Sequence, residues 1–401
     1  MKILFLNHNL IGRGTFFRCM GFARELVKKG HHVDLWTCAK HPDLNGATFL
    51  EDGVRIWQTP RWGGLGRHDG GYAPIDNLAR ITQTFQGSWD VVHAFDHRPN
   101  VLLPWLILRR RLRDSGRDAP VLFAADWCDW WTAGGITTGR RRFSIIDRME
   151  RRIEEGSKRK ADGVTVISSV LKQRALDSGV DENRLLLLPS GVNVDQFPVL
   201  DRASCRQTLG LPQDRIILGF VGFSLWDMGL LAEAFKYIHD RRPNAALLII
   251  GGGVEEGAKK IFHRQFRVGE DVFLPGVAPF SEIPRYLCSC DIQLLPMNDA
   301  IANRARLPNK LCDYMASGRP VVASDVGESS RIINAFQIGE TAKGGSRELA
   351  EACLHLIDHP EKSLELGKKA RLAAETHFSY AHLTKLLCDF YMKILQGDVG
   401  K

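Results

Sequence analysis

Polar and aromatic side chains follow two apolar runs in the first half of the chain, where buried strands are expected to end. Residues 90–99 read Asp-Val-Val-His-Ala-Phe-Asp-His-Arg-Pro, and residues 126–131 read Asp-Trp-Cys-Asp-Trp-Trp. Catalytic and binding loops lie at this end of the strands in an α/β sheet. Tryptophans beside carboxylates often hold a sugar ring, and three tryptophans so close together are hard to bury in a core. The first run predicts a reaction centre, with a satisfied structural histidine as the alternative. The second predicts an acceptor pocket or a membrane-facing rim; its two aspartates lack the further ligands of a metal site.

A third candidate group, Asp313, lies in the second half of the chain. Residues 307–323 read Leu-Pro-Asn-Lys-Leu-Cys-Asp-Tyr-Met-Ala-Ser-Gly-Arg-Pro-Val-Val-Ala, which predicts a polar turn, a helix and a buried strand. Leu311, Tyr314 and Met315 make this helix largely buried, so a simple surface position for Asp313 is disfavoured. Free N–H groups at the start of this helix, and at Gly12-Arg13-Gly14 before an earlier helix, could bind phosphate.

The elements that must position these groups alternate between strands and helices. In the first half, a helix is predicted over 17–29 and strands at 3–7, 33–37, 91–95, 121–124, 163–167 and 185–188. The rhythm restarts after 189–198, with strands at 216–221, 246–250, 272–274, 292–295 and 320–323. This βαβα order predicts parallel sheets covered on both faces. We therefore predict two Rossmann-like α/β halves joined near 189–210, and a mobile loop at the glycine-rich stretch 61–72.

Length and composition agree with this organisation. A chain of 401 residues exceeds the size at which one hydrophobic core keeps growing, so two domains are expected. Its hydrophobic content of 44% and charged content of 25% are ordinary for a globular protein. The nine cysteines contain no C-x-x-C pair, which predicts neither a disulfide framework nor a zinc site. The first apolar run is too short for a signal peptide, and none reaches the roughly 18 residues of a membrane span, so a cytoplasmic protein is expected.

The net charge of +8 is concentrated in basic clusters of the first half, at 109–113, 140–142 and 148–160. Such clusters suit anionic lipid, phosphorylated acceptors or nucleic acid. The alternative is a solvated helix end, because cations stabilise a last helical turn by about 0.3 to 1 kcal/mol. Residues 99–113 combine an apolar helix with a cationic end. This segment predicts either a helix that docks on an anionic bilayer or a buried helix with a basic last turn.

Several motifs, in order along the chain, resemble those of family 4 retaining glycosyltransferases (glycosyl transferases group 1). Residues 307–323 are similar to the family's donor-site pattern PxKLxEYMAxGxPVVA, with Asp313 in place of the usual Glu. The further matching segments are 12–14 with 30–33, 90–99, 161–168, 191–197, 248–253, 273–277 and 290–292. The resemblance implies an α/β GT-B fold, in which two Rossmann-like doubly wound domains face each other across a cleft. It implies an N-terminal acceptor domain at 1–195, a donor domain at 196–378, and a final helix at 379–401 that packs back on the first domain.

The resemblance also implies a donor site, in which Asp313 holds the ribose hydroxyls of a nucleotide-sugar. We expect the other donor-binding residues to be Gly12, Arg13, Gly14, Gly222, Gly276, Val277, Arg306, Lys310 and Leu311. Three positions depart from the family: Ala305 replaces a second Glu, and Phe223 and Met228 replace the Arg and Lys of a diphosphate clamp. Hydrogen bonds to charged groups are worth roughly 1.5 to 3 kcal/mol each, so we expect substitutes for this clamp. Lys310 and Arg306 are the main candidates, and Arg304 and Arg13 are further ones.

For the reaction itself, we expect His93, Asp96 and His97 to line the catalytic centre. Asp126, Trp127, Asp129 and Trp130 are the expected acceptor-binding residues. The function expected is a retaining, metal-independent, hexosyltransferase-like enzyme that moves a sugar from a UDP- or GDP-linked donor to a polysaccharide, glycolipid or small acceptor. We expect no other cofactor and no nucleic acid. We expect peripheral contact with the inner face of an anionic membrane. The alternatives are a glycosyltransferase-like binding subunit that has lost its chemistry, and a GT-B epimerase or phosphorylase acting on nucleotide-sugars.

Overall fold

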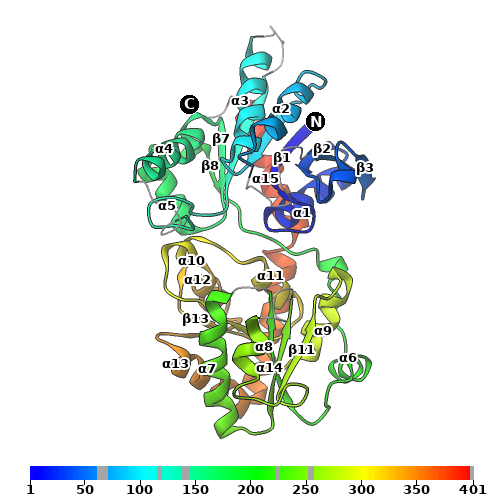
Figure 1. Cartoon of the computed structure of the whole chain (residues 1–401), viewed down its shortest axis with the longest axis vertical. Coiled ribbons are helices and arrows are strands. Elements are labelled where there is room, and N and C mark those ends of the chain that lie inside the picture. Colours follow the sequence, from blue (N-terminus) through cyan, green and yellow to red (C-terminus); the bar gives the residue numbers. More distant parts are fainter. Residues whose placement is uncertain (61–70, 115–119, 138–143, 223–224, 252–256, 398–401) are drawn as a thin grey trace. The chain divides into compact units, whose positions relative to one another are not determined.

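The computed structural model describes residues 1–60, 71–114, 120–137, 144–222, 225–251 and 257–397. It divides into two compact units (Figure 1). The first unit comprises Met1–Pro189 and Tyr380–Lys401, and the second comprises Ser190–Ser379. The chain thus leaves the first unit after Pro189 and returns to it at Tyr380.

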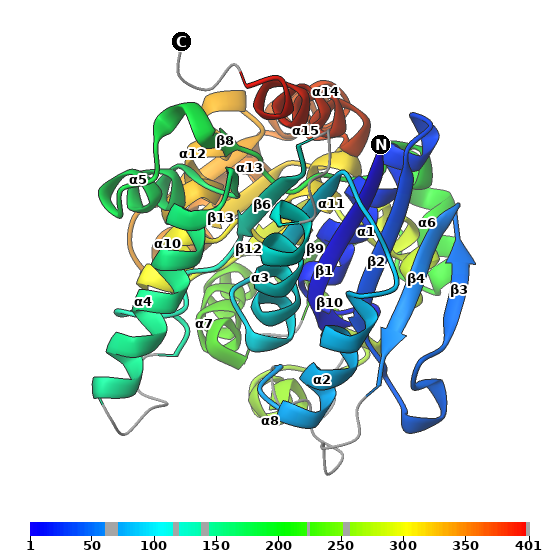
Figure 2. The ribbon, with the colours of Figure 1, turned by 90° about the horizontal axis from the view of Figure 1, so that it is seen from above.

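The first unit contains, within the described residues, an eight-stranded sheet in the order β3-β4-β2-β1-β5-β6-β7-β8. Its strands are β1 (Lys2–Leu10), β2 (His32–Cys38), β3 (Thr48–Glu51), β4 (Val54–Thr59), β5 (Val91–Phe95), β6 (Leu122–Trp127), β7 (Gly163–Val166) and β8 (Leu185–Leu187). All neighbouring strands pair in parallel except β3 and β4, which are antiparallel. Figure 2 shows β1, β2, β4 and β3 side by side.

The helices of this unit are α1 (Thr15–Lys28), α2 (Pro74–Gln83), α3 (Pro99–Arg113), α4 (Ser144–Lys160), α5 (Ser169–Asp177) and α15 (Tyr380–Leu395). Short 3₁₀ helices occur at η1 (Pro42–Leu44) and η2 (Glu182–Arg184). Alternate strand residues such as Ile3 and Phe5 pack with α1 and α15 in one core cluster. On the other face, α3 contacts β1 and β5, and Trp105 packs edge-on against Phe123. Helices therefore cover both faces of the sheet.

The second unit contains a parallel sheet which, in the residues that the structure describes, has six strands in the order β11-β10-β9-β12-β13-β14. They are β9 (Ile216–Val221), β10 (Ala245–Ile250), β11 (Val272–Gly276), β12 (Ile292–Leu295), β13 (Val321–Ser324) and β14 (Gly339–Ala342). The connecting helices are α6 (Arg202–Leu209), α7 (Leu225–Arg241), α8 (Gly257–Phe262), α9 (Ile283–Ser289), α10 (Ile301–Ala305), α11 (Asn309–Ala316), α12 (Gly327–Phe336), α13 (Ser346–Asp358) and α14 (Pro360–Thr376), with 3₁₀ turns η3 (Val194–Gln196) and η4 (Phe280–Glu282). One core cluster joins this sheet to α7, α8 and α13.

The strands predicted from the sequence are confirmed, with shifts at their ends. The largest shifts are of three residues: β1 ends at Leu10 instead of Asn7, and β6 ends at Trp127 instead of Ala124. Asp126 and Trp127 are therefore strand residues and not loop residues. Strands β3, β4 and β14 were not predicted; β3 and β14 have four residues each and little buried surface. Most of the predicted loop at 61–72 lies outside the described residues.

Candidate functional site

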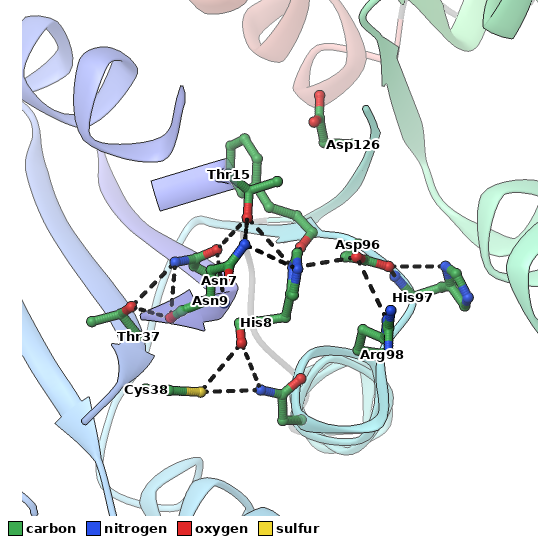
Figure 3. Close-up of polar contacts among 12 residues, drawn as sticks. Asn7, His8, Asn9, Thr15, Thr37, Cys38, Asp96, His97, Arg98 and Asp126 are labelled. Carbon is green, nitrogen blue, oxygen red and sulfur yellow. Dashed lines mark hydrogen bonds and ion pairs between the residues drawn. The ribbon is translucent and has the colours of Figure 1, made fainter. Parts of the chain in front are cut away.

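A network of polar side chains lies at the carboxyl ends of β1 and β5, which pair in parallel (Figure 3). Asn7 on β1 accepts a hydrogen bond from Thr15 Oγ1 at 2.8 Å and donates one to Thr37 Oγ1 at 3.1 Å. The next residue, His8, has its Nδ1 3.3 Å from Asp96 Oδ2. The two strand ends are thereby joined by side chains as well as by the sheet.

Asp96 directly follows β5 and has a backbone φ of 107°, in the region that favours glycine. Holding another residue there costs on the order of 1 to 3 kcal/mol, and such strain concentrates at functional sites. Burial alone would raise the pKa of Asp96, but His8, His97 and Arg98 outweigh it and hold the pKa well below its usual range. Asp96 is therefore an ionised carboxylate in a fixed position.

His97 lies between two carboxylates, as Figure 3 shows for the Asp96 side. Its Nδ1 is 2.9 Å from Asp96 Oδ1, and its Nε2 is 3.7 Å from Glu150 Oε1 of α4. Tyr72 donates a hydrogen bond to the same Glu150 oxygen at 2.5 Å. The structure thus brings the predicted Asp96 and His97 together and adds Glu150 and Tyr72, which were not predicted.

Arg98 and Trp131 form an aromatic and cationic wall beside this network. The Arg98 guanidinium lies 4.0 Å from the centroid of the Trp131 ring and 5.2 Å from that of Tyr72. The rings of His8 and His97 each approach the Trp131 ring edge-on. Each histidine ring centroid lies 6.3 Å from the centroid of Trp131. Guanidinium and indole planes suit a polar ring-shaped ligand, because they offer both hydrogen bonds and an apolar surface.

His93 has a different environment from the one predicted for a catalytic residue. It lies within β5, is completely buried, and contacts Tyr391 Oη at 2.6 Å and Thr165 Oγ1 at 3.2 Å. Burial lowers its pKa to about 3, so the ring is neutral. Because protein groups occupy both ring nitrogens, the structural alternative fits His93, and Asp96 and His97 remain as the catalytic candidates.

Asp126 and Trp127 also lie in the core, away from the acceptor pocket predicted for them. Asp126 is completely buried and accepts hydrogen bonds from Arg18 Nε at 3.1 Å and Nη2 at 2.8 Å. Burial alone would raise the pKa of Asp126, but the Arg18 guanidinium outweighs it and lowers the pKa. The cause is the extension of β6, which carries both residues into the sheet.

A buried carboxylate on α4, Glu154, holds the segment after β6. It accepts hydrogen bonds from Trp127 Nε1 at 3.0 Å, from the backbone N–H groups of Trp131 and Thr132 at 3.2 Å, and from Arg174. Burial alone would raise the pKa of Glu154, but His97, Arg174 and these donors outweigh the effect of burial. The pKa of Glu154 is therefore lowered. Sequence reasoning missed Glu150 and Glu154, although two acids four residues apart in a basic helix were a signal.

The remaining acceptor candidates, Asp129 and Trp130, are partly buried in this segment. The Arg174 guanidinium lies 4.1 Å from the centroid of the Trp130 ring. Together with Trp131 they form the least buried part of the predicted sugar-binding run. They keep their place as candidates, in contrast to Asp126 and Trp127.

The predicted phosphate-binding turn precedes α1. Gly12 and Gly14 have φ values of 74° and 52°, and a Cβ on Gly14 would lie 2.5 Å from Asn9 Nδ2. The backbone conformation of Gly14 therefore strongly favours glycine, and a Cβ there would also displace the Asn9 amide. Arg13 between them is exposed.

In the second unit, Asp313 lies in the middle of helix α11 and is partly buried. Its neighbours Leu311, Cys312, Tyr314 and Met315 are all buried. Burial raises the pKa of Asp313 to about 7. Among the described residues, no hydrogen-bond donor or cation contacts this carboxylate. Leu311, predicted to bind the donor, has a completely buried side chain, which leaves only its backbone for such a role.

Lys310 reaches from the first turn of α11 to the carboxyl end of β9. Its Nζ lies 4.1 Å from the centroid of the Phe220 ring. A Cβ on Gly222, whose φ is 109°, would lie 3.1 Å from this Nζ. Gly276, with a φ of 80°, ends β11, and Val277 after it is 77% exposed. Gly222 and Gly276 therefore lie at the carboxyl ends of β9 and β11, which are separated by β10, and the Lys310 ammonium reaches the end of β9. This is the edge of the sheet at which a phosphate is expected to bind.

The departures from the donor-site pattern are visible in the packing of the second unit. Met228 is buried in the core cluster of this unit, and Ala305 is completely buried. Arg304 is already paired, with its Nε and Nη2 at 2.5 and 2.6 Å from the two carboxylate oxygens of Asp299. Arg306 follows α10, and Phe223 lies outside the described residues.

In the described part of the chain, no group of three or more His, Cys, Asp or Glu side chains is arranged to hold a metal ion. Among the described helices, none combines the length and the apolar character needed to cross a bilayer.

The two units match two families of known proteins. Residues 14–191 match the family described as glycosyl transferase 4-like domain, and residues 215–359 match glycosyl transferases group 1. The fold and the matched segments define a GT-B glycosyltransferase. The chain belongs to the group 1 (family 4) glycosyltransferases, as its motifs predicted.

Individual relatives are distant. The D-inositol 3-phosphate glycosyltransferase of Corynebacterium glutamicum is 24% identical over 405 residues, which cover 94% of this chain and 90% of that protein. Matches with two other curated relatives span only about half of the length of those proteins, at 49% and 51%.

Solved structures share the fold over nearly the whole chain. Sucrose-phosphate synthase from Thermosynechococcus elongatus superimposes with a TM-score of 0.75 at 17% identity, covering 99% of both chains. The Anabaena protein HepE in complex with UDP-glucose superimposes with a TM-score of 0.69 at 17% identity, covering 98% of this chain and 100% of that chain. These likenesses establish the GT-B architecture.

Proposed function

We propose that the protein transfers a sugar from a nucleotide-sugar to a hydroxyl group of an acceptor, with retention of the anomeric configuration. The observation that carries this proposal is Asp313. Burial raises the pKa of this carboxylate to about 7, and no described donor or cation contacts it. It therefore lacks the groups that would compensate its desolvation. Two vicinal ribose hydroxyls would supply two donors to its two oxygens. This is the role that the family pattern gives to the acidic residue of this helix.

The donor we propose is UDP- or GDP-linked. A solved relative in fold, HepE, was obtained with UDP-glucose, which supports a nucleoside diphosphate as the leaving group. Lys310 is the proposed partner of the diphosphate, because its ammonium lies beside Gly222, where a phosphate oxygen could approach without a side chain in the way. Arg306 is the second candidate. No divalent ion or other cofactor is part of this proposal.

The acceptor side of the proposed reaction is formed by Asp96 and His97, with Trp131, Asp129 and Trp130 beside them. A histidine fixed by a carboxylate can orient or accept the proton of an acceptor hydroxyl. The acceptor is a polysaccharide, a glycolipid or a small polyol. A named relative acts on D-inositol 3-phosphate, so this compound belongs in the first acceptor panel.

The proposal is tested by incubating the full chain with UDP- and GDP-sugars and measuring released nucleotide. One donor should be hydrolysed slowly without acceptor and faster when an acceptor is added. The anomeric configuration of the product, read by NMR coupling constants, should equal that of the donor. An inverted product would overturn retention, and the same rates with and without a chelator are expected.

The second candidate function is a binding subunit without chemistry. Met228 and Ala305 favour it, because both are buried apolar residues where the family has charged ones. The two functions differ in one result: calorimetric binding of a nucleotide-sugar without any turnover across the panel would support the subunit.

A further inference from the structure

Helix α4 exposes its apolar side chains instead of burying them. Ile145, Ile146, Met149 and Ile153 are 63%, 46%, 58% and 46% exposed. Three of them recur every four residues, so they form one stripe along the helix. A surface helix normally turns such a stripe toward the core, and contiguous exposed apolar surface marks an interaction site.

The charges of α4 are sorted in the opposite sense. Glu150 and Glu154 point inward and are 6% and 0% exposed, whereas Arg148 and Arg152 are exposed beside the apolar stripe. Arg151 is also exposed, and it pairs with Glu155 at 2.9 Å. The outer face of α4, defined by Ile145, Ile146, Arg148, Met149, Arg152 and Ile153, is therefore apolar and basic.

The helix predicted to dock on a membrane, α3, lacks this arrangement. Its apolar residues Trp105, Leu108 and Leu112 are buried, and Leu103 and Leu106 are less exposed than the stripe of α4, at 38% and 36%. Three of its four arginines are bound within the first unit: Arg111 donates to the carbonyl groups of Thr84 and Gly87, and Arg109 and Arg113 pair with Asp162 at 3.2 and 2.7 Å. The fourth, Arg110, is exposed. The alternative of a buried helix with a basic last turn is therefore the one that α3 fulfils.

We propose that the outer face of α4 docks on an anionic lipid bilayer. An apolar stripe flanked by arginines matches the boundary between acyl chains and negative headgroups, where such helices lie in the plane of the interface. Anionic lipid attracts each nearby arginine electrostatically. A second copy of the chain is a poorer occupant, because it would place the same basic face opposite this one.

Docking would bring the acceptor site to the bilayer surface. The inner face of the same helix carries Glu150, which contacts Tyr72 and approaches His97, and Glu154, which holds the segment with Trp131. A helix is only about 10 Å across, so Asp96 and His97 would lie within about one helix diameter of the lipid. We therefore infer a lipid-linked acceptor. This inference rests on the proposed transferase function, whereas the docking proposal does not.

The test is cosedimentation of the full chain with vesicles of phosphatidylcholine alone or mixed with phosphatidylglycerol. The chain should bind the anionic vesicles, and binding should weaken with salt. The triple variant Ile145→Ser, Met149→Ser, Ile153→Ser and the double variant Arg148→Glu, Arg152→Glu should each lose at least about tenfold in partitioning. Because all these side chains are exposed, thermal unfolding should match that of the unsubstituted chain.

The matched control is the double variant Leu364→Ser, Leu372→Ser in α14, where the side chains are 56% and 58% exposed. It should bind vesicles like the unsubstituted chain. Equal binding by the α4 variants would overturn the proposal. So would a dimer, detected by light scattering, that the triple variant abolishes, because the occupant would then be a second copy. Neither result depends on transfer activity, so the proposed function is tested separately.

Discussion

Asp126 and Asp313 are carboxylates in the first and second units whose pKa values shift in opposite directions. Asp126 is completely buried, yet its pKa is lowered because Arg18 donates two hydrogen bonds to it. Asp313 is partly buried, yet its pKa rises to about 7. The presence of a built-in cation, and not the depth of burial, decides the charge. The first unit thus supplies Asp126 with its own cation, whereas the second unit leaves Asp313 for a ligand.

Breaking the built-in pair should have the largest effect. Arg18→Met leaves the Asp126 carboxylate buried without its cation, which should lower the free energy of unfolding by about 3 to 5 kcal/mol. Urea unfolding measures this loss. The double variant Arg18→Met, Asp126→Leu should recover much of the stability, because the uncompensated charge is gone. A loss below about 1 kcal/mol in the single variant would show that the pair does not hold the first unit together.

Removing the Asp313 carboxylate should instead affect the binding of the ligand. Asp313→Ala should weaken binding of the matching nucleotide by about 1.5 to 3 kcal/mol, the scale of hydrogen bonds to a charged group. Calorimetry with UDP and GDP measures it. Arg304→Met is the control, because Arg304 already pairs with Asp299, and it should bind nucleotide normally. Unchanged affinity in a folded Asp313→Ala variant would refute the ribose contact.

Substitution of the proposed diphosphate-binding residues should affect turnover more than donor binding. Lys310→Met or Arg306→Met should reduce kcat by about tenfold or more and affect donor binding less, because charge on the leaving diphosphate grows in the transition state. Steady-state kinetics with the best donor of the panel would show this split. Full activity in both single variants and in the double variant would exclude both residues as the clamp.

The smallest effect concerns pH. The pKa of Asp313 is about 7 in the folded chain and 3.8 in its ordinary state, so between these values the unfolded chain releases a proton that the folded chain keeps. Stability contributed by the protonated carboxyl is therefore lost as pH rises through this window. Asp313→Asn cannot ionise, and it should gain about 1 kcal/mol over the unsubstituted chain between pH 5 and pH 6. A constant difference across this range in urea unfolding would contradict the raised pKa.

Local sequence was enough for most strands and for grouping Asp96 with His97 as candidates, because a short segment after β5 contains both residues. It was not enough for His93, whose partner Tyr391 lies almost 300 positions away in the chain. Asp126 and Trp127 were misplaced because β6 continues beyond its purely apolar residues. Their burial is made tolerable by distant partners, among them Arg18 for Asp126 and Glu154 for Trp127. Glu150 and Glu154 were missed because α4 reverses the usual sidedness of a surface helix.

The return of α15 to the first unit has a consequence for biosynthesis. Tyr380, Leu387 and Phe390 belong to the core of that unit, and a Cβ on Gly21 of α1 would lie 2.2 Å from the Tyr380 ring. The ribosome makes the whole second unit before these residues appear. At about 5 to 20 residues per second, that delay is on the order of ten seconds or more. During this time, the apolar surface of α1 that α15 covers is open to solvent, so the nascent chain offers chaperones a binding site that its last helix removes.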